Sequence, residues 1–292
     1  MAFYNVMKLE YHDFIQYRIY EKPVEYDVKA DLKKEDVSSA DSGECIDVEA
    51  RKERSMYVSL NRTKQSVYSL AYNNKWDWFV TLTFSDEKVD RYDYSEIIKK
   101  TRNWFNNVKK RFAPDLKYIL IPEPHKDGAY HLHGLLANCG ELQFVDSGRV
   151  VDHGKSRKKN CSNADLPTIY NIANWQFGFS TATKVQSNAK CVSYMTKYIT
   201  KDLCVIAQKR RRYLASNNLD RVEREYLNIP RDQIDNFLVQ AYLEDRVDYA
   251  KTQKIPEAGQ HINYVTIKKG ERLNIGAQKN KGLSPLNLFP RK

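Results

Sequence analysis

Three short segments in the middle of the chain have the pattern of β-strands. In FVTLTF (79–84) alternate positions are large and apolar, and β-branched or aromatic residues dominate, as is typical of strands. KYILI (117–121) and YHLHGLL (130–136) flank the turn-forming segment PEPHKDG (122–128). Two strands joined by a short polar turn predict an antiparallel hairpin.

Helical periodicity appears between and after these strands. A helix is predicted from Asp93 to about residue 112, because Asp93 and Glu96 have the spacing of a capping box and Pro114 follows the last apolar position. Residues 187–203 are predicted to form a second helix. The apolar stripe of the first helix consists of Ile97, Thr101, Trp104, Phe105, Val108 and Phe112.

The remaining segments have weaker patterns. Residues 1–24 are rich in aromatic side chains and fit either a strand or a short helix. Residues 138–168 are polar and basic and indicate a long loop, and residues 170–183 indicate a short helix and a strand. Residues 221–250 are predicted to be helical, before a tail that contains Gly, Pro and Lys.

Together these elements predict an α/β (α+β) fold, a small antiparallel sheet flanked by helices with a helical C-terminal extension. The predicted division is an N-terminal arm and acidic linker (1–50), a catalytic domain (51–216), and a helical accessory region with a basic tail (217–292). Residues 25–50 read as a linker because they hold nine acidic residues and three lysines and few large apolar side chains.

Charge adds a partner to this picture. The 292 residues contain 48 Lys and Arg against 37 Asp and Glu, a net charge of +11. Since residues 25–50 carry −9 + 3 = −6, the rest of the chain carries +17. Such an excess favours a polyanionic partner, most often nucleic acid.

Compartment is indicated by what the sequence lacks. No apolar run has the length of a membrane span, and the first residues have no apolar signal core. The five cysteines are odd in number and widely spaced, without a CxxC motif. We therefore expect a soluble protein of a reducing cytoplasm, that of a bacterial host cell, with no membrane partner and no disulfide framework.

The segment after residue 122 carries candidate metal ligands. His131 and His133 are separated by one residue in a strand, so their imidazoles share a face. Glu123, on the neighbouring strand end, supplies an oxygen, and two nitrogens with a carboxylate suit Mn²⁺ or Mg²⁺. The alternative is a half-buried strand with satisfied histidines. His125, in the turn, fits a supporting contact or a solvated side chain.

A second chemical motif is YMTKYITK (194–201). On a continuous helix, Tyr194 and Tyr198 lie together opposite the apolar stripe, flanked by Lys197 and Lys201. A phenol is a weak nucleophile unless its phenolate is favoured, which nearby lysines and a divalent cation achieve. The alternative is a solvated helix face with two amphipathic tyrosines.

Two basic clusters are candidate DNA contacts. Each is open to the alternative of a solvated surface. They consist of Lys155, Arg157, Lys158 and Lys159, and of Arg210, Arg211 and Arg212.

In this order, the motifs resemble those of rolling-circle replication initiators of the HUH endonuclease superfamily. The branch found in single-stranded DNA phages and Gram-positive mobile elements is the most similar. FVTLTF resembles the first motif, EPHKDGAYHLHG (123–134) the metal motif and YMTKYITK the tyrosine motif, and RRRYLASNNL (210–219) resembles a basic stretch that often follows. The resemblance covers roughly residues 55–216.

The resemblance implies a split βαβ fold and a site-specific single-strand endonuclease and ligase. Glu123, His131 and His133 would hold Mg²⁺ or Mn²⁺, and a tyrosine would form a 5′-phosphotyrosine link to origin DNA. Tyr198 is expected to attack first and Tyr194 to act in termination, because single-tyrosine relatives carry their nucleophile and lysine where YITK stands.

The implied partners are single-stranded DNA at a replication origin and the host helicase and polymerase. The alternatives are a transposase or relaxase with the same chemistry, and a non-catalytic DNA-binding regulator on the same fold.

Overall fold

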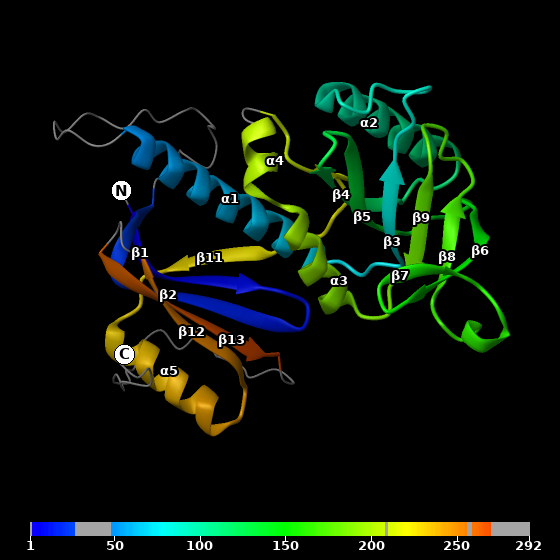
Figure 1. Ribbon diagram of the computed structural model, residues 1–292. Helices are drawn as coiled ribbons and strands as arrows, with labels where there is room; N and C mark the ends of the chain where they lie inside the picture. Colours follow the sequence, from blue (N-terminus) through cyan, green and yellow to red (C-terminus); the bar gives the residue numbers. More distant parts are fainter. Residues whose placement is uncertain (1, 27–47, 208–209, 256–258, 270–292) are drawn as a thin grey trace. The chain divides into compact units, whose positions relative to one another are not determined.

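The structure, a computed structural model, describes residues 2–26, 48–207, 210–255 and 259–269. The chain divides into two compact units (Figure 1). The central unit comprises residues 44–221, and the terminal unit comprises residues 1–43 and 222–292. The mixed α+β class predicted from the sequence is confirmed.

The central unit is built on an eight-stranded antiparallel sheet. Its strand order is β10-β4-β5-β3-β9-β8-β6-β7. The strands are β3 (Trp78–Thr83), β4 (Lys117–Pro124), β5 (Tyr130–Ala137), β6 (Phe144–Asp152), β7 (Lys155–Lys158), β8 (Thr168–Ile172), β9 (Ser180–Lys184) and β10 (Leu214–Ala215).

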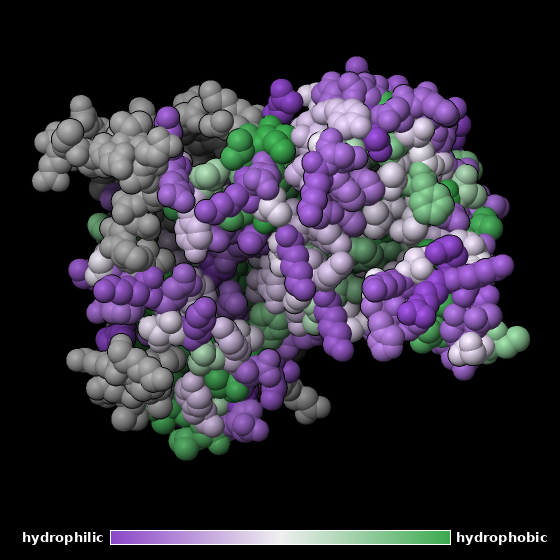
Figure 2. Space-filling view, in the orientation of Figure 1, coloured by the Kyte–Doolittle hydropathy of each residue, from purple (hydrophilic) through white to green (hydrophobic). Residues whose placement is uncertain are grey.

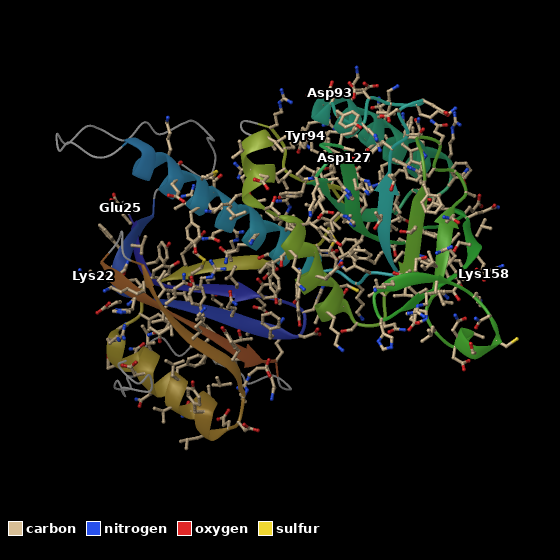
Figure 3. The ribbon with its side chains drawn as sticks, in the orientation of Figure 1. Lys22, Glu25, Asp93, Tyr94, Asp127 and Lys158 are labelled. Carbon is tan, nitrogen blue, oxygen red and sulfur yellow. The ribbon has the colours of Figure 1, made fainter. Side chains whose placement is uncertain are left out.

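The middle of this sheet is a split βαβ unit. β3 and β4 both run antiparallel to β5, which lies between them, so β3 and β4 are parallel to each other. Helix α2 (Tyr94–Arg111) connects them. The Asp93 side chain caps α2 by accepting a hydrogen bond from the Ser95 N–H at 2.8 Å, and Asp93 and Tyr94 stand together at its start (Figure 3). The predicted strand, helix and hairpin are all present.

Aromatic side chains fix α2 against one face of the sheet. The Trp104 ring lies edge-on to Trp175 at 5.2 Å between centroids, and the Phe105 ring lies 4.3 Å from that of Tyr118. Phe105 is completely buried. Since alternate strand residues point to opposite faces, α2 leaves the other face of β3, β4 and β5 to the chemistry.

The helix predicted over 187–203 is interrupted. It consists of α3 (Asn188–Met195), a 3-10 turn η2 (Thr196–Tyr198) and α4 (Lys201–Ile206). Thr200 has extended backbone angles, and its side chain accepts a hydrogen bond from the Leu203 N–H at 3.2 Å. The prediction of one continuous helix was wrong because a threonine hydroxyl that caps a new helix also ends the old one. Both helices pack against α1 (Val48–Tyr72).

Two segments of the central unit contain more strand than the sequence predicted. Most of the expected loop 138–168 is a hairpin, β6 with β7, at the edge of the sheet. Residues 170–183 lie in β8, a turn and β9, with no helix in that segment. Strands rich in Lys, Arg and Ser at a sheet edge lack the apolar alternation on which sequence prediction depends.

The terminal unit joins both ends of the chain in one sheet. Its five antiparallel strands have the order β11-β1-β2-β13-β12, and helix α5 packs on one face. Val6, Ile19 and Val265 on this face meet Ile234 and Leu238 of α5. The elements are β1 (Ala2–Glu10), β2 (Phe14–Tyr26), β11 (Glu223–Leu227), α5 (Arg231–Leu243), β12 (Val247–Ile255) and β13 (Gln260–Lys268).

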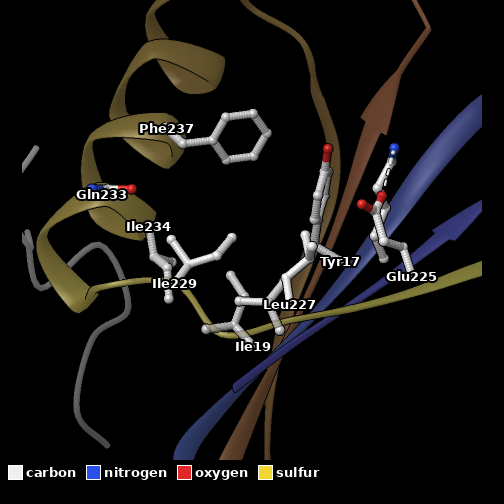
Figure 4. A pocket seen from close by; sticks show the side chains of 10 residues that line it. Tyr17, Ile19, Glu225, Leu227, Ile229, Gln233, Ile234 and Phe237 are labelled. Carbon is white, nitrogen blue, oxygen red and sulfur yellow. Dashed lines mark hydrogen bonds and ion pairs between the residues drawn. The ribbon is translucent and has the colours of Figure 1, made fainter. Parts of the chain in front are cut away.

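A cavity of about 410 Å³ remains between α5 and this sheet (Figure 4). Phe237 and Ile234 face it from the helix, and Tyr17 and Leu227 face it from the strands. The ring of Tyr17 lies 5.0 Å from that of Phe237, so the two aromatic side chains partly fill the gap.

The predicted helical C-terminal extension was therefore wrong over much of its length. Residues 221–250 contain one helix between two strands, and β13 follows. The physical reason is that β11 is paired with β1, more than 200 residues earlier in the chain, so the partner that makes it a strand is not local. The acidic segment 27–47 and the tail 270–292 lie outside the described residues.

Candidate active site

The register of three strands collects the predicted metal ligands on one face of the sheet. His131 lies opposite Glu123 on β4 and opposite Thr83 on β3. His133 lies opposite Thr81. Because directly opposed residues point to the same side, these five side chains form one surface, here called the histidine face.

The His133 ring is held at both nitrogens. Its Nε2 lies 2.7 Å from Oε2 of Glu123, and its Nδ1 lies 3.1 Å from Oγ1 of Thr81. Burial lowers the pKa of His133, although Glu123 opposes that effect. The imidazole is therefore neutral near pH 7, and the contact to Glu123 is a hydrogen bond in which Nε2–H donates to the carboxylate.

His131 is also held in its neutral form. Burial, with the nearby His125 and His133, lowers the pKa of His131 to about 4. The ring of His125 stacks on it with 3.8 Å between centroids, and Oγ1 of Thr83 lies 3.5 Å from its Nδ1. Neutral imidazole is the form that binds metal ions, because the ligand nitrogen needs a free lone pair.

Both tyrosines of the second motif meet this face. The ring of Tyr198 stacks on His133, with 3.8 Å between centroids and 8° between planes. Tyr194 lies edge-on to Tyr198 at 5.3 Å and also contacts Phe79 of β3. Tyr198 is half-buried, whereas Tyr194 is 46% exposed. Segments far apart in the sequence thus form one site.

Packing behind the tyrosines explains how they arrive there. Val192, Met195, Ile199 and Leu203 are at most 1% exposed and belong to the core of the central unit. These residues form most of the predicted apolar stripe, which survives the break in the helix. Burying this stripe turns the side chains between its members toward the histidine face.

The surroundings of Tyr198 favour the phenol over the phenolate. Burial raises the pKa of Tyr198 well above its ordinary value of 10, and its hydrogen bond with Tyr194 and the Glu123 carboxylate act in the same direction. A nucleophilic Tyr198 therefore has to lose its proton in the presence of a positive charge that this arrangement does not itself contain.

The two lysines of the motif have different surroundings. Nζ of Lys197 lies 5.3 Å from the centre of the Tyr194 ring, within the range of a cation–π contact. Lys201 pairs with Glu53 of α1 at 3.6 Å, and both side chains are more than half exposed. The structure brings Lys197 to the tyrosines, and it places Lys201 against α1.

A divalent cation matches the chemistry of the donors rather than their present spacing. Within the described residues, no group of three or more His, Cys, Asp or Glu side chains is arranged to hold a metal ion. Two of the predicted donors, Glu123 and His133, are hydrogen-bonded to each other. Two neutral imidazoles and a carboxylate are nevertheless suitable ligands for Mn²⁺ or Mg²⁺, once that hydrogen bond opens.

The first basic cluster lies on the edge hairpin, far along the sheet order from β5. Lys155 and Lys158 are exposed on β7, and hydrophilic side chains gather over this hairpin (Figures 2 and 3). Arg157 pairs with Asp152 at 2.9 Å, and Lys159 pairs with Asp146 at 3.2 Å.

The second basic cluster has a structural component. Arg212 donates to the Ser59 carbonyl and hydroxyl and to the Thr63 hydroxyl, all on α1, at 2.6 to 3.1 Å. Arg210 donates to the Ser95 hydroxyl at 2.9 Å, and Arg211 is exposed. Arg212 thus ties the end of the motif region to α1.

Sequence reasoning missed the two threonines of the histidine face. Thr81 and Thr83 alternate in FVTLTF as His131 and His133 alternate in HLH. That shared period is visible in the sequence. It becomes informative only when the register of β3 against β5 is known, because a shift of one residue would turn the hydroxyls to the opposite face.

Comparison with known families gives one match. Residues 77–203 match a family described as replication-associated protein, of the ORF2 type. The match covers less than half of the chain and includes β3, the hairpin and both tyrosines. Neither the curated proteins nor the solved structures give a match.

The match supports a replication-associated protein family and hence involvement with DNA. No helix in the described ranges has the length and apolar character needed to cross a bilayer.

Proposed function

We propose that this protein is a site-specific single-strand DNA endonuclease and ligase of the HUH superfamily that initiates rolling-circle replication. The observation that carries the proposal is the stacking of Tyr198 on His133, 3.8 Å apart, beside Glu123. A structural tyrosine has no need of a histidine pair and a carboxylate. A tyrosine that attacks a metal-polarised phosphate needs all three.

The proposed chemistry is a transesterification. The phenolic oxygen of Tyr198 attacks the scissile phosphorus, and the bond from phosphorus to the 3′ oxygen breaks. The protein becomes linked to the 5′ phosphate, and the released 3′ oxygen takes up a proton to become the priming hydroxyl. The phosphodiester bond energy is retained in the link, so the strand can be rejoined by attack of a 3′ hydroxyl.

Residues around the tyrosines divide the remaining work. Glu123, His131 and His133 would hold Mg²⁺ or Mn²⁺, which supplies Lewis-acid polarisation of the phosphate when bound. Lys197, over the Tyr194 ring, places positive charge beside the second tyrosine. Tyr194 is more exposed than Tyr198 and would make the second attack, which closes the circle.

The test uses the full-length protein, Mn²⁺ and a pool of single-stranded oligonucleotides of about 40 nucleotides with a randomised centre. Each oligonucleotide carries one dye at its 5′ end and another at its 3′ end. A 5′-phosphotyrosine link transfers only the 3′ dye to the protein band on a denaturing gel. Mass spectrometry then identifies the residue that carries the DNA.

The expected result is an adduct on Tyr198 that is lost in Tyr198→Phe and in excess chelator. Tyr194→Phe should keep the adduct and lose strand rejoining, and Tyr249→Phe, an exposed tyrosine of the terminal unit, is the matched control. Binding without any adduct would instead indicate a non-catalytic regulator. Full cleavage in chelator would refute the metal, and a first adduct on Tyr194 would reverse the assigned order.

The match to a replication-associated family favours an initiator over a transposase or relaxase with the same chemistry. The partners that follow from the proposal are single-stranded DNA at a replication origin and the host helicase and polymerase, in a bacterial cytoplasm.

A further inference from the structure

The two threonines of β3 repeat one contact at the two histidines. Thr81 Oγ1 lies 3.1 Å from His133 Nδ1, and Thr83 Oγ1 lies 3.5 Å from His131 Nδ1. Each threonine is the residue directly opposite its histidine in the β3–β5 ladder. The sheet register therefore places a hydroxyl behind each imidazole, on the nitrogen that does not face Glu123 in the case of His133.

A hydroxyl differs from the usual partners at this position. Metal-binding histidines generally donate their second N–H to a carboxylate or a carbonyl, which can only accept and so fix one tautomer. A threonine hydroxyl both donates and accepts. It can therefore pair with Nδ1 whether or not that nitrogen carries the ring proton.

His133 needs that versatility because its Nε2 has two possible partners. In the arrangement seen here, Nε2–H donates to Glu123, so the neutral ring has a bare Nδ1 that accepts from the Thr81 hydroxyl. If Nε2 instead binds a cation, the proton of the neutral ring must be on Nδ1. The Thr81 hydroxyl then has to accept.

We propose that Thr81 and Thr83 are positioning residues for the histidine pair, and that rotation of the Thr81 hydroxyl lets His133 exchange Glu123 for a divalent cation without losing its second hydrogen bond. The inference rests on the proposed function. The exchange conserves protons, because one ring proton leaves Nε2, one is gained at Nδ1 through solvent, and the ring stays neutral throughout.

The two threonines are expected to differ in weight. The Thr83 contact is the longer, at the limit of a hydrogen bond, so its hydroxyl should contribute less. The Thr83 backbone is fixed separately, since its N–H donates to the Phe179 carbonyl at 2.8 Å and its carbonyl accepts from Trp175 Nε1 at 3.1 Å. Loss of the Thr83 hydroxyl should therefore leave β3 in place.

The experiment combines NMR of the full-length protein, labelled with ¹⁵N histidine, and calorimetric titration with Mn²⁺. The variants are Thr81→Val, Thr83→Val and Thr81→Ser. Thr181→Val is the matched control, because Thr181 lies opposite Thr81 on the other neighbouring strand, β9. Valine is nearly isosteric with threonine and favours strands, and circular dichroism checks that each variant folds.

In metal-free wild type, His133 should be the Nε2–H tautomer with a hydrogen-bonded Nδ1. Addition of diamagnetic Zn²⁺ as a probe should move the proton to Nδ1. Thr81→Val should shift the His133 Nδ1 resonance in the metal-free protein and weaken Mn²⁺ binding about 10- to 100-fold, the usual effect of losing such a supporting contact. Thr83→Val should have a smaller effect, Thr81→Ser should restore binding, and Thr181→Val should change nothing.

Wild-type Mn²⁺ affinity with an unchanged Nδ1 resonance in Thr81→Val would overturn the positioning role. An Nδ1–H tautomer in the metal-free wild type would overturn the exchange. If wild type binds no divalent cation, the metal-dependent function and the exchange fail together, whereas the positioning role is still decided by the metal-free spectra.

Discussion

Gly134 follows His133 directly, and replacing it with alanine should disturb both the fold and the site. An added Cβ would lie 2.2 Å from Cδ2 of Leu120 and 2.6 Å from the carbonyl oxygen of Ile119. Leu120 is completely buried, so its side chain cannot turn into solvent. The Ile119 carbonyl belongs to the β4 backbone and moves only if β4 and β5 separate.

The cost follows from these contacts. Overpacking of a buried site costs about 1–3 kcal/mol, and the lower chain entropy of alanine in the unfolded state returns about 0.4–1 kcal/mol. A net loss of about 1–2 kcal/mol remains. For a domain of this size, that corresponds to a fall of about 2–8 °C in the melting temperature.

The same strain reaches the site because His133 is the preceding residue. Its contacts to Glu123 at 2.7 Å and Thr81 at 3.1 Å bridge β5 to β4 and β3, so separating β4 from β5 should lengthen the first of them. Thermal unfolding measures the stability change, and the His133 ¹⁵N signals report the local one.

Gly148→Ala is the control for Gly134→Ala. No atom lies within 4 Å of the Cβ added there, and only its φ of 67° opposes a side chain. It should cost about 1 kcal/mol and leave the histidine signals unchanged. A Gly134→Ala protein as stable as wild type, with unchanged histidine signals, would show that the two strands are not held at the separation described here.

Further predictions concern charge. Changing Lys155 and Lys158 together to alanine should weaken binding to all single strands and lower the salt slope by about 1.4, if each contacts one phosphate; an unchanged slope would make them solvated surface. Arg212→Ala should lower thermal stability by about 1–3 kcal/mol, because it removes charge-assisted hydrogen bonds to α1, and equal melting curves would contradict this. Lys269 lowers the pKa of Glu10 below its ordinary 4.5, so the stability that Glu10 contributes is present above pH 4.5 and disappears as the pH falls through the lower folded-state pKa. Glu10→Gln should therefore unfold more easily than wild type by about 0.5 kcal/mol near pH 7, and the difference should shrink as the pH falls below about 4, as followed by urea titration.

What the sequence predicted well depends on contacts close along the chain. The hairpin of β4 and β5 has a short turn, so its register follows from local sequence, and this register brings Glu123 opposite His131. The two histidines share a face because strand alternation needs no information from elsewhere.

The failures have the opposite character. EDRVDYAKTQKI (244–255) is rich in residues that favour helices, yet residues 247–255 form β12, because β13 pairs with them along their whole length. β11 is a strand through its pairing with β1 at the other end of the chain. Tertiary pairing decides such segments, and local propensity does not record it.

The site itself is decided by a combination of both kinds of contact. The tyrosine motif was predicted on one continuous helix, where Tyr194 and Tyr198 would share a face through the helical period alone. In the structure the helix ends between them, and their rings meet because each also contacts a side chain of the sheet, Phe79 or His133. The position of Tyr198 is thus tied to the imidazole rather than to the helix, and a movement of His133 should carry the proposed nucleophile with it. Metal binding and the placement of Tyr198 are therefore one coupled event in this arrangement.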